Sequence, residues 1–294
     1  MADCPPEGEW AMPPRSAPTG RQQRIGAELR KLRERAGFST RHAGQLLSVN
    51  AARISSIESG RFGVSAERVR MFAHNYGCAD EAYIAALADM TVGRGRQWWD
   101  EYRQLLPSGL LDLAELEHHA TAISTAQIAH LPGLMQTVDY ARVIFQQSIP
   151  ALSPPEIEHR ISHRIKRQEI LYGDAPTPFK AIIHEAALRM QFGGRRVAKE
   201  QLCRVAELSE LPHVTVLVIP YSAGVFPGAG QTVLYAFGPV PQLDTVQLDS
   251  EHGSECVYAD YQLEKYRTFM RRFEDVALQE AASREFLHQV ISEL

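Results

Sequence analysis

The sequence predicts an N-terminal all-α helix-turn-helix bundle followed by an α+β domain with a mixed four- or five-stranded sheet. Two observations lead to this fold class. Between residues 19 and 77, apolar residues recur at helical spacing, and short helices end at glycines. After residue 109, short apolar runs typical of strands are mixed with amphipathic helical segments. We divide the chain into a disordered proline-rich tail (1–18), a helix-turn-helix DNA-binding domain (19–77), a helical linker (78–108) and an α+β regulatory or interaction domain (109–294).

Charge is divided unevenly between these parts. Residues 15–76 hold twelve Lys or Arg and four Glu, which gives a net charge of +8. Because residues 1–14 carry −3 and the whole chain carries −4, residues 77–294 carry −9. A basic segment joined to an acidic body indicates that the N-terminal part binds a polyanion and that DNA does not wrap around the body.

The basic segment is expected to contain four or five short helices. In the first, Ile25, Leu29, Leu32 and Ala36 form one apolar stripe that ends at Gly37. Polar caps mark the starts of the next three, with Ser39 or Thr40 before a helix ending at Leu46 or Leu47, Asn50 before 51–59, and Ser65 before a helix closed by Gly77.

The second and third of these helices are joined by only three residues, 48–50. This tight connection is typical of a helix-turn-helix module. The third helix places Ile54 and Ile57 inward and has small or polar residues elsewhere, which lets a helix enter a major groove about 12 Å wide. A helical bundle whose arginines are merely solvated is the alternative, and it accounts less well for pattern, charge and turn together.

The run FSTRHAGQLLSVNAARISSIESGR (38–61) resembles the repressor-type helix-turn-helix of the XRE family. The resemblance implies that Thr40 contacts phosphate and that Glu58 pairs with Arg33 of the first helix, away from DNA. It implies that the following residues face DNA: Asn50, Ala51, Ala52, Arg53 and Ser56.

This sequence departs from the family pattern at two places. Ala51 and Ala52 stand where relatives often carry larger base readers, so base discrimination depends on Arg53 and Ser56. Gly44 follows Ala43 where Leu-Ala is usual, which by propensity weakens the second helix by roughly 1 kcal/mol. We expect Arg41 and Arg61 to add affinity through phosphate contacts.

The body is expected to mix strands and helices. Strands are predicted at 122–129, 179–184, 214–219, 232–237 and 246–249, with a short further strand at 256–258. Amphipathic helices are predicted at 139–147, 156–171, 197–208, 261–278 and 283–294.

The body also resembles the C-terminal region of actinobacterial XRE-type regulators of an antitoxin-like group. The resembling segments are GRGRQWWDEY, LEHHATAISTAQIAHLPGLMQT, HEAALRMQFGG, LPHVTVLVIPYSAG and EKYRTFM. The resemblance implies a small partner protein encoded by an adjacent gene, while leaving the chemistry of this domain undefined.

Two clusters in the body are candidate ligand or partner sites. Trp98, Trp99 and Tyr102 suit an interface or pocket wall, or the core alone. His184 and Glu185 stand at a strand-to-helix junction with Arg189 one turn on, which fits a site or a helix-terminal ion pair.

Metal, cofactor and membrane functions find no support. His159 and His163 have metal-pair spacing but arginine neighbours, so a solvated helix face is expected. The four cysteines have no zinc spacing and are expected to be reduced, no apolar run approaches a membrane span, and the first residues do not form a signal peptide.

We therefore expect a cytoplasmic, sequence-specific, homodimeric transcriptional regulator of double-stranded DNA that is not an enzyme and has no cofactor. Its body binds a partner protein or a second copy. The alternative is a ligand-sensing regulator with a small-molecule pocket, or a vestigial enzyme, in the C-terminal domain. An antitoxin that neutralises its partner by contact remains a third hypothesis.

Overall fold

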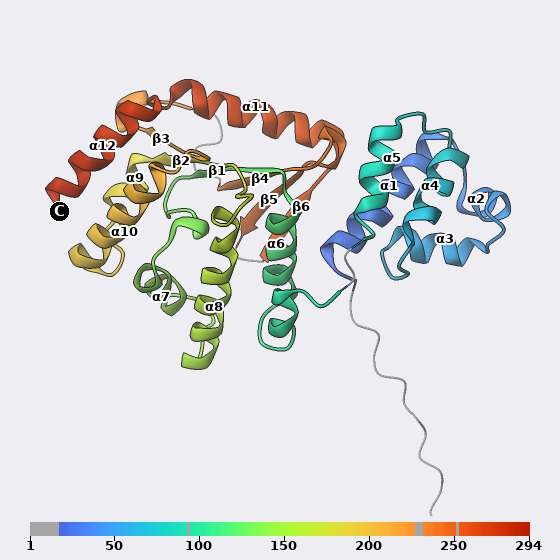
Figure 1. Ribbon diagram of the computed structural model, residues 1–294, viewed down its shortest axis with the longest axis horizontal. Helices are drawn as coiled ribbons and strands as arrows, with labels where there is room; N and C mark the ends of the chain where they lie inside the picture. The colour runs from blue at the N-terminus through green and yellow to red at the C-terminus, as the bar shows by residue number, and fades with distance from the viewer. Residues whose placement is uncertain (1–17, 93–94, 227–231, 251–252) are drawn as a thin grey trace, which may run out of the picture.

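A computed structural model describes residues 18–92, 95–226, 232–250 and 253–294. The predicted tail therefore lies almost wholly outside the described residues. A bundle of five helices, α1 to α5, lies beside a larger body built on one sheet (Figure 1). The predicted fold class, a helical N-terminal region followed by an α+β domain, is confirmed.

The bundle consists of α1 (Gly20–Arg35), α2 (Thr40–Leu46), α3 (Ala51–Glu58), α4 (Ala66–Asn75) and α5 (Glu81–Asp89). Each helix begins where a polar side chain accepts a hydrogen bond from a backbone N–H three residues on. The capping residues are Thr19, Ser39, Asn50, Ser65 and Asp80.

The apolar stripe of α1 is buried at the centre of the bundle. Leu29 packs there with Ile54 of α3 and Phe72 of α4. Helix α5 lies in the segment expected to be a helical linker, yet it buries Ile84 and Leu87 in the same core.

The body begins with a 3₁₀ turn, η1 (Trp98–Tyr102). The remaining helices are α6 (Ser108–His119), η2 (Gly133–Met135), α7 (Val138–Gln146), α8 (Pro154–Arg167), η3 (Gln168–Leu171), α9 (Glu185–Arg189), α10 (Gly194–Ser209), η4 (Tyr221–Ala223), η5 (Pro241–Leu243), α11 (Asp260–Val276) and α12 (Glu280–Glu293). The strands are β1 (Ala122–Gln127), β2 (Phe179–His184), β3 (Val214–Ile219), β4 (Val233–Phe237), β5 (Thr245–Ser250) and β6 (Gly253–Val257).

The strands form one six-stranded mixed sheet in the order β3-β2-β1-β4-β5-β6. Strands β1, β2 and β3 are parallel, whereas β4, β5 and β6 are antiparallel neighbours. The expected count of four or five strands is too low by at least one. The edge strand β6 is exposed along most of its length and carries GSEC, which has no apolar alternation.

Alternation along the strands divides the core between two faces. One face of β2 and β3 packs Ile183 and Val216 against α10 and α12. The opposite face packs Ile182 and Val246 against α11, which crosses the sheet in Figure 1. Because each strand contributes to both faces, helices cover both sides of the sheet.

Polar contacts join α1 to the body. The backbone N–H of Gly20 donates to Asp112 Oδ1 of α6 at 2.8 Å, and the Arg24 guanidinium donates to Thr245 Oγ1 of β5 at 3.2 Å. Farther along the helix, Lys31 and Arg35 both pair with Asp260 at the start of α11. The body therefore holds α1 at three places.

Candidate nucleic-acid interface

The turn between α2 and α3 is built on close backbone contacts. Ser48 adopts a positive φ of 54°, and the Val49 N–H donates to the Gly44 carbonyl at 2.8 Å. A Cβ on Gly44 would lie 2.6 Å from Val49 O, closer than such atoms approach. Gly44 is therefore required for the close approach of the turn.

Helix α3 presents a small polar face opposite its buried one. Ile54 and Ile57 are buried, whereas Asn50, Ala52 and Ser55 are exposed. The Asn50 side chain accepts from the Arg53 backbone N–H at 2.7 Å, so it serves as the helix cap. A helix with this outer face fits closely against a groove floor.

The Arg53 guanidinium lies over an aromatic ring that the sequence pattern does not indicate. Its Cζ atom is 3.4 Å from the ring centroid of Phe62, in the segment after α3. Such a contact reduces the rotamer freedom of the arginine. Phe62 lies beyond the end of α3, so helical periodicity does not predict its contact with Arg53.

Arg33 and Glu58 form the pair that the family resemblance implies. Arg33 Nε lies 2.6 Å from Glu58 Oε1, and Nη2 lies 3.0 Å from Oε2. Arg33 Nη1 also donates to the Phe38 carbonyl at 2.6 Å. Both side chains are only 8% exposed, so the pair lies behind α3 rather than on its outer face.

The remaining predicted DNA contacts occupy accessible positions. Arg41 in the first turn of α2 and Arg61 just beyond α3 are exposed. Thr40, Ala51 and Ser56 are half-buried. With Arg53, these residues surround the exposed side of the α2–α3 unit. The segment that contains this unit, residues 15–76, carries a net charge of +8.

The aromatic cluster of η1 is packed rather than open. Trp99 and Tyr102 are buried, and Tyr102 Oη lies 2.8 Å from Ser162 Oγ of α8. The half-buried Trp98 ring lies 5.3 Å from the imidazole of His163. The cluster holds η1 against α6 and α8, which favours core packing over a ligand pocket.

The second predicted cluster is also satisfied internally. Glu185 is buried, and its two oxygens accept from Arg189 Nε at 2.6 Å and from the Tyr221 N–H at 2.8 Å. Arg189 pairs further with Glu293 of α12 at 2.5 Å. His184 Nδ1 accepts from the Ala186 N–H as a helix cap. These contacts tie β2, α9 and α12 together.

Two family models match the chain. A helix-turn-helix domain model matches residues 24–87, and a domain of unknown function, DUF5753, matches residues 110–289. The chain belongs to the DUF5753 family. No curated protein and no solved structure matches it. The helix-turn-helix domain assigns DNA binding to the N-terminal bundle and points to a regulator, whereas the function of the DUF5753 domain is unknown.

Within the DUF5753 domain, α8 differs from expectation. His163 is only 1% exposed and packs against Trp98 and Tyr102, so it does not lie on a solvated helix face. Burial, and then the neighbouring Arg167 and Arg164, lowers the pKa of His163 to about 3. The described residues contain no group of three or more His, Cys, Asp or Glu that could hold a metal ion.

A second buried ion pair fixes α8 to α6 in the DUF5753 domain. Arg167 Nε and Nη2 each lie 2.7 Å from a carboxylate oxygen of Glu117. The side chains are 6% and 1% exposed. The described cysteines Cys78, Cys203 and Cys256 are free thiols, and none of the described helices is long and apolar enough to cross a membrane.

Proposed function

We propose that the protein is a sequence-specific transcriptional regulator that reads operator DNA with α3. One observation carries the proposal: a capped helix with a small exposed face follows a close turn and is fixed from behind by the Arg33–Glu58 pair. Such a helix enters a major groove without a change in its own structure.

The proposed contacts fall into two groups. Arg53 and Ser56 read base edges, and Asn50, Ala51 and Ala52 lie against the groove floor. Thr40, Arg41 and Arg61 contact phosphates, which supply affinity without sequence preference. The stacking of Arg53 on Phe62 limits the directions in which its guanidinium points.

We propose further that the active form is a homodimer. Two copies related by a twofold axis would place their α3 helices about 34 Å apart, one turn of DNA, on one face of the duplex. The acidic DUF5753 domain would provide the dimer contact, the contact with a small protein encoded by an adjacent gene, or both. The resemblance to actinobacterial antitoxin-like regulators supports the second partner.

A selection of random duplexes with the full-length chain tests the DNA-binding proposal. We expect enrichment of a twofold-symmetric sequence whose half-sites are centred about ten base pairs apart. Enrichment of no sequence above the input would contradict sequence-specific reading. The selected duplex then serves as the probe for all affinity measurements below.

Mass measurement in solution tests the assembly. Sedimentation of the chain alone and with the selected duplex is expected to give two copies per duplex. Co-expression with the protein of the adjacent gene, followed by purification through one partner, tests the antitoxin-like role. A monomer on DNA would contradict the dimer, and absence of co-purification would contradict the partner.

A further inference from the structure

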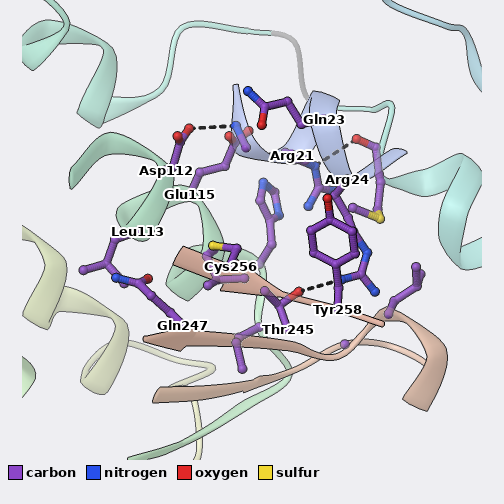
Figure 2. Close-up of a pocket in the computed structure, with 18 of the residues that line it drawn as sticks. Arg21, Gln23, Arg24, Asp112, Leu113, Glu115, Thr245, Gln247, Cys256 and Tyr258 are labelled. Atoms are coloured by element: carbon purple, nitrogen blue, oxygen red, sulfur yellow. Dashed lines mark hydrogen bonds between the residues drawn. The ribbon is translucent and has the colours of Figure 1, made fainter. Parts of the chain in front are cut away.

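A cavity of about 820 Å³ lies between the helix-turn-helix bundle and the DUF5753 domain. Figure 2 shows Arg21 and Arg24 of α1 on one side of it, Asp112 and Glu115 of α6 on a second, and residues of the sheet below. A volume of this size suits a small organic ligand. None of the residues in the two clusters singled out from the sequence lines it.

The sheet face that lines the cavity is unusually polar. Strand register places Gln247 opposite Cys256, on the same face as Thr245, and all three line the cavity. At the other end of the sheet, the same face carries Ile183 and Val216, which pack under helices. This face of the sheet is aliphatic where helices cover it and polar where it lines the cavity. Such a change suits a ligand-binding surface better than a protein core.

The charges around the cavity are mainly negative. Its charged side chains are Arg21 and Arg24 against four carboxylates, Asp89, Asp112, Glu115 and Glu255. His119 also lines the cavity, but burial lowers its pKa to about 4, so it adds no positive charge at neutral pH. Arg24 is already paired with the buried Glu28, Nε to Oε1 at 3.0 Å. The charge of Arg24 is therefore not available to balance the carboxylates of the lining.

Asp112 and Glu115 are held in a poorly solvated position one turn apart on α6. Burial raises the pKa of both carboxyl groups above the ordinary values. Gly20 donates one hydrogen bond to Asp112; Glu115 has a hydrogen bond with the Thr19 side chain, and Arg21 acts on it only at a distance. A cation placed between them would stabilise their charged forms.

Much of the remaining lining is apolar. Met90 comes from the end of α5, Leu113 and Leu116 from α6, and Leu243 from η5. The Tyr258 ring adds an aromatic surface on which the Arg24 guanidinium lies, 4.6 Å from the ring centroid. The cavity therefore combines an anionic side with an apolar body.

We propose that this cavity binds a small monocation with an apolar or aromatic body, of the alkylamine or arylamine class, and that its occupancy changes DNA binding. The ammonium group lies between Asp112 and Glu115, and the apolar part lies against Leu113, Leu116 and Tyr258. The second half of the proposal rests on the DNA-binding function proposed above.

Helix α1 connects the cavity to the recognition helix. Its first two turns form a wall of the cavity. At Gly26 it crosses the end of α3 so closely that a Cβ there would lie 2.6 Å from the carbonyl oxygens of Ile57 and Glu58. The Arg33–Glu58 pair adds a second attachment. A ligand that shifts α1 against the body therefore moves α3 with it.

Calorimetric titration of the full-length chain tests the ligand class without DNA. The probes are phenylbutylamine, its neutral analogue phenylbutanol and its anionic analogue phenylbutyrate. We expect the amine to bind about tenfold more tightly than the alcohol, a difference of about 1.4 kcal/mol, and the acid to bind most weakly. Equal binding of amine and alcohol would overturn the assignment of a cation.

Substitutions place the charge recognition at the two carboxylates. Asp112→Asn keeps an oxygen acceptor for the Gly20 N–H, so the junction is retained. Together with Glu115→Gln it is expected to remove the preference for amine over alcohol. Glu285→Gln, at an exposed position on α12, is the matched control and is expected to leave the preference unchanged. An unchanged preference in the double variant would overturn the proposed site.

Cys256 reports occupancy of the cavity directly. Its thiol lines the cavity, whereas Cys203 lies on α10 of the body. We expect saturating phenylbutylamine to slow alkylation of Cys256 by iodoacetamide severalfold, followed by peptide mass analysis, with no change at Cys203. Equal rates at Cys256 with and without the amine would place binding elsewhere.

The coupling is measured with the selected duplex by fluorescence anisotropy. We expect saturating amine to change the Kd for DNA by about threefold or more, and the Asp112→Asn, Glu115→Gln variant to lose this response. Amine binding with an unchanged Kd would overturn the coupling and leave the cavity assignment standing. Failure to bind any duplex would overturn the proposed function without affecting the titration or alkylation results.

Discussion

The Arg33 guanidinium and the Glu58 carboxylate form a two-point ion pair between α1 and the end of α3, with N–O distances of 2.6 and 3.0 Å. The pair is 8% exposed on both sides. It fixes the recognition helix to the helix that also contacts the DUF5753 domain. Its removal is therefore expected to affect folding before it affects DNA contacts.

Glu58→Ala is expected to destabilise the bundle by about 3–5 kcal/mol, because it leaves the Arg33 guanidinium buried without its carboxylate. Urea unfolding followed by circular dichroism measures the loss. Asp89→Ala removes the exposed Arg70–Asp89 pair of the bundle and is the control, with an expected loss under about 1 kcal/mol. Equal losses in the two variants would show that the buried pair contributes no more to stability than an exposed pair does.

Arg53→Ala is expected to weaken binding of the selected duplex by about 1–3 kcal/mol and to relax sequence preference at one base pair of each half-site. Phe62→Leu is expected to produce a smaller loss in the same direction, because it removes the ring on which the guanidinium lies. Fluorescence anisotropy with matched and mismatched duplexes measures both.

Arg196→Ala, at an exposed position of α10, is the control for this series. It is expected to leave affinity and preference unchanged. If Arg53→Ala lowered the affinity for all duplexes equally, Arg53 would be a phosphate contact and not a base reader.

Sequence patterns predicted most of the helices of the bundle. Caps such as Asn50 and Ser65 mark helix starts because a short polar side chain satisfies an otherwise unpaired N–H, and this effect is local. The strands of the body also follow from local apolar runs. The strand β6 was predicted only at its end, as a short strand at 256–258, because its exposed polar residues pair through the backbone and leave no apolar pattern.

Features that depend on distant partners could not be predicted in this way. Arginine is usually solvated, yet Arg167 lies in the interior, where it pairs with Glu117, fifty residues earlier. The contact of Arg53 with Phe62 and the cavity beside Asp112 likewise depend on how segments meet. Periodicity indicates which faces are apolar, but not which charged groups find partners.

Gly44→Ala is expected to destabilise the protein, although helix propensity alone favours alanine by roughly 1 kcal/mol. The added Cβ would meet Val49 O at 2.6 Å, so the α2–α3 turn must move. We expect a net loss of about 1–3 kcal/mol in urea unfolding, together with weaker DNA binding. Gly95→Ala, where a Cβ meets nothing within 4 Å, is the control. A stabilised Gly44→Ala variant would show that the turn relaxes freely.

Stability is expected to fall as the pH is lowered from 6.5, through the buried His163. Burial, and then Arg167 and Arg164, lowers its pKa from 6.5 to about 3. Between these values the unfolded chain binds a proton that the folded protein does not, so the contribution is fully present above pH 6.5 and decreases below it. The loss amounts to at most about 1.4 kcal/mol per pH unit.

Urea unfolding at several pH values measures this loss of stability. The His163→Phe variant should show a shallower slope, and His288→Phe, at an exposed position, should match the parent. A parent-like slope in His163→Phe would assign the acid sensitivity to other groups, of which His119, with a pKa lowered by burial to about 4, is the next to test.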